Sequence, residues 1–179
     1  QALSYPKLDA ARKFTNKLWN MGRFIEINRS PSFAKASAGK QNSKLKTQKY
    51  GNNLTIKQLS NFAQHKNDKQ WIGKVRNLSE EITKHLDNYS FNLAAERLYD
   101  FAWHEFADKY IEKVKSQKSS IRQAQDDPEL IEGSKVKSSD ENSFIILNSL
   151  FLILLKLLHP FMPFVTEEIY QKMTNHEGS

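Results

Sequence analysis

Residues Leu157 to Tyr170, with the sequence LLHPFMPFVTEEIY, decide how this chain folds. Pro160 and Pro163 lack a backbone N–H and clash with a preceding carbonyl group, so the apolar run before them must end or kink there. Thr166 is expected to cap a new helix, whose positive end would be stabilised by the two glutamates that follow it. The turn between the two helices is expected to be held in a core, since its apolar residues are Phe161, Met162, Phe164 and Val165.

The helix that ends at these prolines is predicted over about residues 140–159 and contains the run FIILNSLFLILLKLLH. This run is apolar on nearly every side, so other parts of the protein must surround it. A transmembrane span is the alternative, because about 20 predominantly apolar residues cross a bilayer. Lys156 within the run and the prolines after it argue against such a span, so we expect no membrane partner.

Apolar residues at steps of three and four predict four further helices, and no segment has the alternation of a strand. The first is predicted over about residues 7–28, and the second is a short helix over residues 54–66. The third follows a cap at Asp68 and ends near residue 87, and the fourth follows a cap at Asn92 and ends near residue 115. The predicted class is therefore all-α.

Each of these helices has a predicted inward side. On the first helix it comprises Leu8, Ala11, Phe14, Leu18, Met21, Gly22 and Ile25. On the fourth it comprises Ala94, Leu98, Phe101, Ala102, Phe106, Ile111 and Val114. Gly73 lies early in the third helix, where glycine costs about 1 kcal/mol relative to alanine. Either a close helix crossing requires this glycine, or the helix begins weakly.

Two polar stretches, residues 29–53 and 116–139, separate the predicted helices. Both are rich in Ser, Lys, Gln and Asn, so neither can bury enough apolar area to offset the cost of ordering. We expect them to be long flexible loop insertions in a single domain that spans residues 1–179. The beginning of the chain, QALSYPKLDAARK, does not resemble a signal peptide, and we expect a cut inside a longer protein there.

Charge is distributed unevenly along the chain, whose net charge is +7. Residues 1–78 hold 16 Lys and Arg against 3 Asp and Glu, a balance of +13, and residues 79–179 hold 11 against 17, a balance of −6. A basic half favours a nucleic acid partner, because neutralised phosphates release counterions. A solubilising surface with a basic loop explains the charge equally well. The absence of cysteine excludes a disulfide scaffold and is compatible with a cytoplasmic protein.

The first helix carries a polar stripe opposite its inward side. Arg12, Asn16, Asn20 and Arg23 recur at steps of four, four and three, and Trp19 lies at the edge of the stripe. Arginine and asparagine can hydrogen-bond to bases and phosphates, and an aromatic ring can stack on an unpaired base. The alternative, which the pattern alone favours, is a solvated polar face with Trp19 packed against a neighbouring helix.

Three stretches stand out: ARKFTNKLWNMGRF at residues 11–24, WIGKVRNLSEEITKHLDNYSFNLAAERLYDFAWHEFADKYIE at residues 71–112, and HPFMPFVTEE at residues 159–168. They resemble the anticodon-binding helical domain of class I aminoacyl-tRNA synthetases, and of valyl-tRNA synthetases in particular. Together they cover roughly half of the chain in the family's order. The resemblance implies an antiparallel helix bundle that binds the anticodon stem and loop. Isoleucyl and leucyl enzymes are an alternative, although their closing motif usually differs at the His-Pro and Met-Pro positions.

The resemblance also implies that the first helix lies against the anticodon stem and loop. Residues 16–20 match the family's NKLWN motif, and Arg23 and Phe24 match the Arg-Phe pair that follows it, so Arg23 is the first candidate for an RNA contact. Asn16 and Asn20 could instead cap or bridge helices. The full set of RNA-binding candidates is Arg12, Asn16, Lys17, Trp19, Asn20, Arg23 and Phe24.

The family's HIGH and KMSKS sequences, which hold ATP for aminoacyl adenylate formation, do not occur in this chain. We therefore expect no catalytic residue and no cofactor in this domain, and the resemblance implies that ATP and magnesium serve the catalytic domain of a parent chain. The implied partners are a tRNA, most simply a valine tRNA, and that catalytic domain. A monomer is the default expectation.

Two alternative hypotheses propose a function other than RNA binding. A metal site could use His104, Glu105 and Asp108, but the second histidine of an HExxH motif is missing. Polar bonding between helices is therefore the expected role of these residues, and no metal ligand is assigned. A helical interaction or membrane-associated protein, built around the apolar run at residues 144–158, is the remaining alternative.

Overall fold

The computed structural model describes residues 5–28, 54–63, 65–116 and 133–174, in which every regular element is a helix. The prediction of an all-α fold is confirmed for these residues. The elements are α1 (Tyr5–Ile27), α4 (Ile56–Phe62), α5 (Lys66–Asp87), α6 (Phe91–Asp100), η1 (Phe101–Ile111), α8 (Gly133–Leu158) and α9 (Pro163–Thr174). The predicted insertion at residues 29–53 lies outside the described residues, as does most of the second. The second insertion, predicted over residues 116–139, is shorter than predicted, because residues 133–139 belong to α8.

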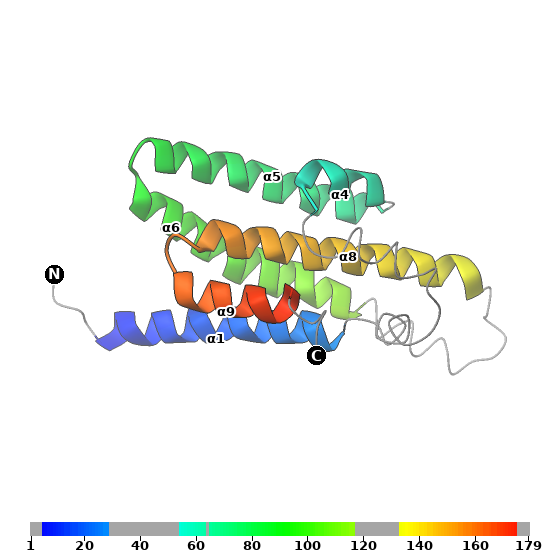
Figure 1. The fold of residues 1–179 in the computed structure, drawn as a ribbon, viewed down its shortest axis with the longest axis horizontal. Helices are drawn as coiled ribbons and strands as arrows, with labels where there is room; N and C mark the ends of the chain where they lie inside the picture. The colour runs from blue at the N-terminus through cyan, green and yellow to red at the C-terminus, as the bar shows by residue number, and fades with distance from the viewer. Residues whose placement is uncertain (1–4, 29–53, 64, 117–132, 175–179) are drawn as a thin grey trace.

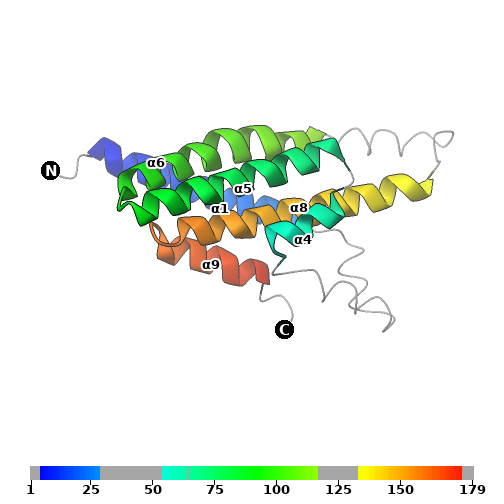
Figure 2. The same cartoon turned by 90° about the horizontal axis from the view of Figure 1, so that it is seen from above.

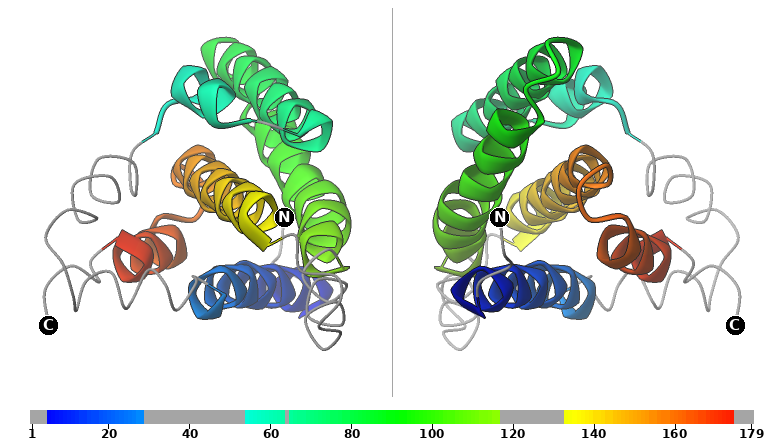
Figure 3. Two further views of the ribbon diagram at one scale, coloured as in Figure 1. Left: turned by 90° about the vertical axis from the view of Figure 1, so that its right-hand side faces the viewer. Right: turned by 90° about the vertical axis from the view of Figure 1, so that its left-hand side faces the viewer.

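The apolar helix α8 runs through the middle of the bundle, with α1, α5, α6 and α9 around it (Figures 1 and 3). Its residues Leu150, Phe151 and Leu154 are completely buried, so the prediction that this run must be surrounded is confirmed. No helix in the described part of the chain has the length and hydropathy needed to cross a membrane. Burying each such side chain contributes about 1.5–3 kcal/mol, which makes α8 the centre of the core.

Consecutive long helices run in opposite directions, as an antiparallel bundle requires. The pair α5 and α6 forms one hairpin and the pair α8 and α9 forms another (Figures 1 and 2). Helix α1 closes the bundle on one side, where it packs against α9, α8 and η1. Because α9 turns back from the end of α8, it runs in the same direction as α1 (Figure 1).

Helix α1 buries only part of its predicted inward side. Phe14, Leu18 and Ile25 are buried, whereas Leu8 is 51% exposed and Ala11 is also exposed. The prediction for these two residues was wrong because the first turns of α1 extend beyond the ends of the neighbouring helices (Figures 1 and 2).

The hairpin between α5 and α6 is closed by main-chain hydrogen bonds. The N–H of Ser90 donates to His85 O at 2.8 Å and the N–H of Tyr89 donates to Leu86 O at 3.0 Å, the pattern of a Schellman motif. Tyr89 occupies the left-handed position of this motif with φ of 57°. The predicted cap at Asn92 is wrong, because these bonds end the turn earlier and α6 begins at Phe91.

Helices α4 and α5 begin differently from their predicted starts. Helix α4 is shorter than predicted, and a capping box between Thr55 and Gln58 starts it. Helix α5 starts at Lys66, and Asp68 is not its cap but a buried residue of the first turn, whose Oδ2 accepts a hydrogen bond from Ser143 Oγ at 3.0 Å. A Cβ at Gly73 would meet no atom within 4 Å, so no close helix crossing requires this glycine.

The predicted fourth helix contains a π-helical segment, η1, between α6 and a final α-helical turn. Its buried residues come in adjacent pairs four to five positions apart, the spacing of a wider helix: Phe101 and Ala102, Phe106 and Ala107, Tyr110 and Ile111. The prediction of a uniform α-helix missed Ala107 and Tyr110 as core residues for this reason.

The closing turn has a different start from the predicted one. The N–H groups of Phe161 and Met162 both donate to Leu158 O at 3.0 Å, and α9 begins at Pro163, where a missing N–H has no cost. Thr166 is therefore inside the first turn of α9, buried, with its hydroxyl donating to Met162 O at 2.8 Å. The cap predicted at Thr166 was wrong.

The apolar turn is only partly held in the core. Phe161, Met162 and Val165 are half-buried against it, but Phe164 is 91% exposed, contrary to prediction. The Nδ1 of His159 lies 3.0 Å from Thr166 Oγ1, so His159 links the end of α8 to α9.

Candidate nucleic-acid interface

The outer side of α1 carries the polar stripe predicted from the sequence. Arg12, Asn16, Asn20 and Arg23 are all exposed, while the buried side of the same helix faces α8, η1 and α9. In the end-on views of Figure 3, α1 lies along one edge of the bundle with α8 on its inner side, so no other helix covers its outer side. The stripe is thus a continuous, solvent-facing surface.

Within the stripe, the residues differ in how they are held. Arg12 Nη2 lies 2.7 Å from Asp9 Oδ1 one turn earlier, and Lys13 Nζ lies 2.8 Å from Asp9 Oδ2. Hydrogen bonds from Lys13 and Arg12 lower the pKa of Asp9, so this carboxylate offsets part of the positive charge near the start of α1. The unpaired positive charge of the stripe therefore lies at its other end, at Arg23.

Asn16, Asn20 and Arg23 make no side-chain hydrogen bond or ion pair within the described residues. The alternative in which the two asparagines cap or bridge helices has no support there. These three side chains are available to an external partner, and Arg23 supplies a positive charge that no carboxylate in the described part of the chain neutralises.

Two other candidates, Lys17 and Phe24, lie on the flank of α1 that faces η1. Lys17 Nζ is 2.9 Å from Asp108 Oδ1 and 5.3 Å from the centre of the Trp103 ring. Phe24 is half-buried, and Lys115 Nζ lies 5.0 Å from its ring centre. The structure therefore separates these two from the outer stripe and gives them contacts within the protein.

Trp19 lies on the opposite flank, beside α9. It is 37% exposed, and Lys172 Nζ lies 4.5 Å from the centre of its ring. The same ammonium group is 3.0 Å from Glu168 Oε1 on α9. Trp19 is thus packed against a neighbouring helix, as the structural alternative held, and still exposes part of its ring.

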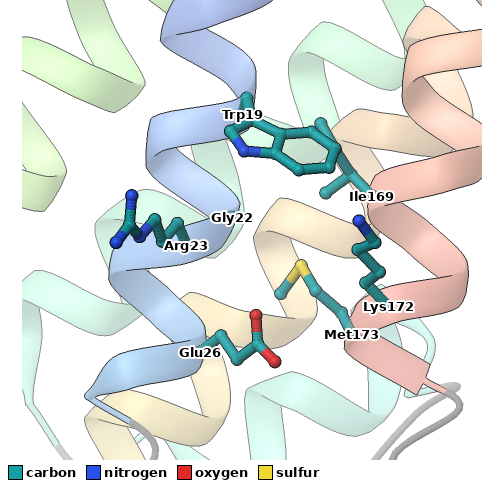
Figure 4. Close-up of a pocket in the computed structure, with 7 residues that line it drawn as sticks. All are labelled: Trp19, Gly22, Arg23, Glu26, Ile169, Lys172 and Met173. Carbon is teal, nitrogen blue, oxygen red and sulfur yellow. The ribbon is translucent and has the colours of Figure 1, made fainter.

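A pocket of about 270 Å³ opens between α1 and α9 at this point (Figure 4). Its lining residues are Trp19, Gly22, Arg23, Glu26, Ile169, Lys172 and Met173. In Figure 4 the side chains of Trp19, Lys172 and Met173 converge between the two helices, and Arg23 stands at the outer rim with its guanidinium directed away from α9. Sequence analysis missed the α9 residues, because they lie about 150 positions from Trp19 and belong to no polar stripe of their own.

Gly22 sets the distance between the two helices. An ideal Cβ on Gly22 would lie 2.8 Å from Ile169 Cγ2, closer than real Cβ atoms approach another atom, and 3.4 Å from Phe151 Cε1. A glycine at this crossing therefore allows α9 to approach α1 closely enough to form the pocket.

The side chains of His104, Glu105 and Asp108, the alternative metal site, form ion pairs. Glu105 Oε2 is 2.7 Å from Lys74 Nζ on α5, and Asp108 pairs with Lys17 on α1, which confirms polar bonding between helices. His104 Nδ1 is 3.6 Å from Asp108 Oδ2. The described residues contain no group of three or more side chains that could hold a metal ion.

Burial and neighbouring charge act in opposite directions on Glu105. Desolvation raises its pKa, but the hydrogen bond and charge of Lys74, together with the charges of Arg97 and Lys109, outweigh it and hold the pKa below its usual value. Glu105 is therefore an ionised structural partner between α5 and η1.

A family model described as the anticodon-binding domain of tRNA ligase matches residues 68–179, well over half of the chain. The chain belongs to this family. Among its relatives, the valine–tRNA ligase of Aquifex aeolicus is 30% identical over 98% of this chain and 13% of the relative. The valine–tRNA ligase of Lactococcus lactis is 32% identical over 98% of this chain. The chloroplastic/mitochondrial valine–tRNA ligase of Arabidopsis thaliana is 34% identical over 96% of this chain.

The chain spans only 13–17% of the length of these relatives. The family match includes the stretches at residues 71–112 and 159–168 that carry the resemblance. Which side chains contact RNA stays a prediction, because neither the match nor the helical arrangement includes a bound nucleic acid.

Proposed function

We propose that this chain is the anticodon-binding part of a valine–tRNA ligase and that α1 binds the anticodon stem and loop of a valine tRNA. The observation that carries the proposal is the exposed stripe on the outer side of α1, defined by Arg12, Asn16, Asn20 and Arg23. From Arg12 to Arg23 the stripe extends about 16 Å at 1.5 Å per residue, enough to contact several nucleotides.

The chemistry of the stripe suits a folded RNA loop. Arginine binds phosphates and the guanine edge through two hydrogen bonds, and asparagine pairs with the adenine edge. Unpaired loop bases present these edges, whereas the deep major groove of an RNA helix hides them. Basic side chains of α1, among them Arg12 and Arg23, would supply the phosphate attraction that positions the loop without selecting its sequence.

The domain would act by placing the tRNA for a catalytic domain carried elsewhere in the parent chain. That domain would use ATP and magnesium, and this one would contribute binding free energy alone. Each well-made base contact is worth roughly 1–3 kcal/mol of discrimination, so two or three contacts are enough for strong selection among anticodons. The related isoleucine and leucine enzymes are the competing assignment, and a comparison of anticodons separates them.

The test is a titration of the protein with an RNA hairpin that copies the anticodon stem and loop of a valine tRNA, at two salt concentrations. Hairpins with altered valine anticodon bases, and with isoleucine and leucine anticodons, serve as competitors. Arg23→Ala should weaken binding and reduce the slope of log K against log salt by about one. Arg76→Ala is the matched control, because Arg76 is an exposed arginine on α5, on the far side of the bundle from α1 (Figure 1).

A preference for the valine hairpin that Arg23→Ala reduces and Arg76→Ala leaves unchanged would support the proposal. If both variants weaken binding equally, the attraction is general and α1 is not the interface. Preference for another anticodon would reassign the domain within the family. Failure of all hairpins to bind at low salt would refute the proposed function for the isolated chain.

A further inference from the structure

We infer that the pocket between α1 and α9 takes one unstacked base of the bound RNA, stacked on the ring of Trp19. The inference rests on the proposed function and adds a site on α9 that the polar stripe does not include. It has three parts: an accessible ring face, an apolar floor of limited size, and a cation that can move from the ring to a phosphate.

The ring face of Trp19 is the first part. The ring is partly exposed and Lys172 Nζ lies 4.5 Å from its centre, so the π face is directed into the pocket and not against the core. Tryptophan has the strongest attraction for cations and a large flat surface for stacking. A nucleobase can use the same face, since every base has a π surface.

The second part is the shape and chemistry of the pocket. Ile169 and Met173 form its buried apolar floor, and Gly22 leaves the space in which they approach α1. Its volume of about 270 Å³ is just below the roughly 300–1,000 Å³ of pockets that hold drug-sized ligands. A methionine floor adapts to a planar ring, so the pocket fits one base better than a longer segment.

The third part is the position of Lys172. Its ammonium group is held by Glu168 at 3.0 Å and by the Trp19 ring, two partners near the protein surface. A base that stacks on Trp19 must displace the ammonium, and the phosphate beside that base offers it a new partner. Lys172 thus exchanges a ring contact for a phosphate contact, while Arg23 at the outer rim joins the pocket to the stripe on α1.

The experiment compares Trp19→Ala and Trp19→Phe in binding the valine anticodon hairpin, with Arg76→Ala as control. Loss of a stacked base costs about 1–3 kcal/mol, so Trp19→Ala should raise Kd about 5- to 150-fold. Trp19→Phe keeps a stacking surface and should recover most of this loss. Hairpins with a single abasic nucleotide at each loop position locate the stacked base. At one position the missing base should lower the affinity of the wild-type protein, but it should cause no further loss of affinity in Trp19→Ala.

Lys172→Met is the second variant, chosen because the Lys172 side chain is half-exposed and its loss leaves the core intact. It should weaken binding and lower the salt slope by about one. An unchanged Kd for Trp19→Ala, an equal loss in Trp19→Phe, or an unchanged salt slope for Lys172→Met would overturn the inference while leaving hairpin binding by α1 intact. If the wild-type protein binds no hairpin, the proposed function fails and the pocket inference fails with it.

Discussion

The same substitution at two helical glycines should change stability in opposite directions. Gly73→Ala places a methyl group where no atom lies within 4 Å, so only the helix propensity changes, and alanine is favoured by about 1 kcal/mol in a helix interior. Gly22→Ala gains the same propensity, but its methyl group would lie 2.8 Å from Ile169 Cγ2. Ile169 is buried and β-branched, so its side chain has little freedom to move away.

The expected magnitudes follow from these two terms. Overpacking a tight site costs about 1–3 kcal/mol, so Gly22→Ala should lower the free energy of unfolding by up to about 2 kcal/mol after the propensity gain. Gly73→Ala should raise it by about 1 kcal/mol. For a domain of this size, 1 kcal/mol corresponds to about 2–4 °C in Tm.

Urea denaturation and thermal melting of the two variants beside the wild-type protein provide the assay. Each variant is the control for the other, because both exchange glycine for alanine inside a long helix. Equal stabilisation by both substitutions would refute the reasoning, since it would mean that α9 does not approach α1 closely at Gly22. That result would also remove the structural basis of the pocket.

Two further predictions concern a buried hydroxyl group and a half-buried ion pair. Tyr110 is fully buried and its hydroxyl has no hydrogen-bond partner among the described residues, so Tyr110→Phe should raise the free energy of unfolding by about 1 kcal/mol, measured by urea denaturation. A loss of stability would instead show that the hydroxyl has a partner. Glu105→Gln should cost about 1 kcal/mol at pH 7 by removing the ion pair with Lys74. Because the pKa of Glu105 is lower in the folded state, its contribution is complete above the unfolded pKa and is lost as pH falls through the folded one. The difference from wild type should therefore shrink as the pH falls through the folded pKa of Glu105, with Glu80→Gln at an exposed position of α5 as the control.

The core of the fold could be predicted because burial has a period. Phe14, Leu18 and Ile25 on α1, and the apolar run of α8, are buried as their spacing requires. The failures at the start of α1 have a simple cause: spacing shows which side of a helix is apolar but not how far the neighbouring helices extend. Leu8 belongs to the apolar side and is exposed because the first turns of α1 extend beyond the neighbouring helices (Figure 1).

Helix starts were predicted poorly for another reason. A polar side chain near a helix start can satisfy the free N–H groups of that helix, or it can bond to a residue far along the chain. Asp68 bonds Ser143 on α8, and Thr166 bonds the carbonyl of Met162 and lies beside His159. Local sequence does not distinguish these uses, because the competing partner is supplied by tertiary structure.

The candidate site was predicted only as far as one helix reaches. Steps of three and four identified the outer stripe, but they could not tell that Lys17 turns to η1 and Trp19 turns to α9. Those assignments depend on which helix lies on each flank of α1. That information is carried by the connections of the bundle and not by α1 itself.

The closing turn links the fold to the proposed site. Pro160 and Pro163 end α8 and start α9, and the reversal sends α9 along α1 in the same direction. Gly22 then admits Ile169, and the next turn of α9 brings Lys172 over Trp19. A shift of α9 by one residue would rotate Lys172 by about 100° around its axis, away from the ring. The segment that fixes the end of the bundle therefore also fixes the geometry of the pocket, and changes to the turn should alter binding through α9 even though no turn residue lines the pocket.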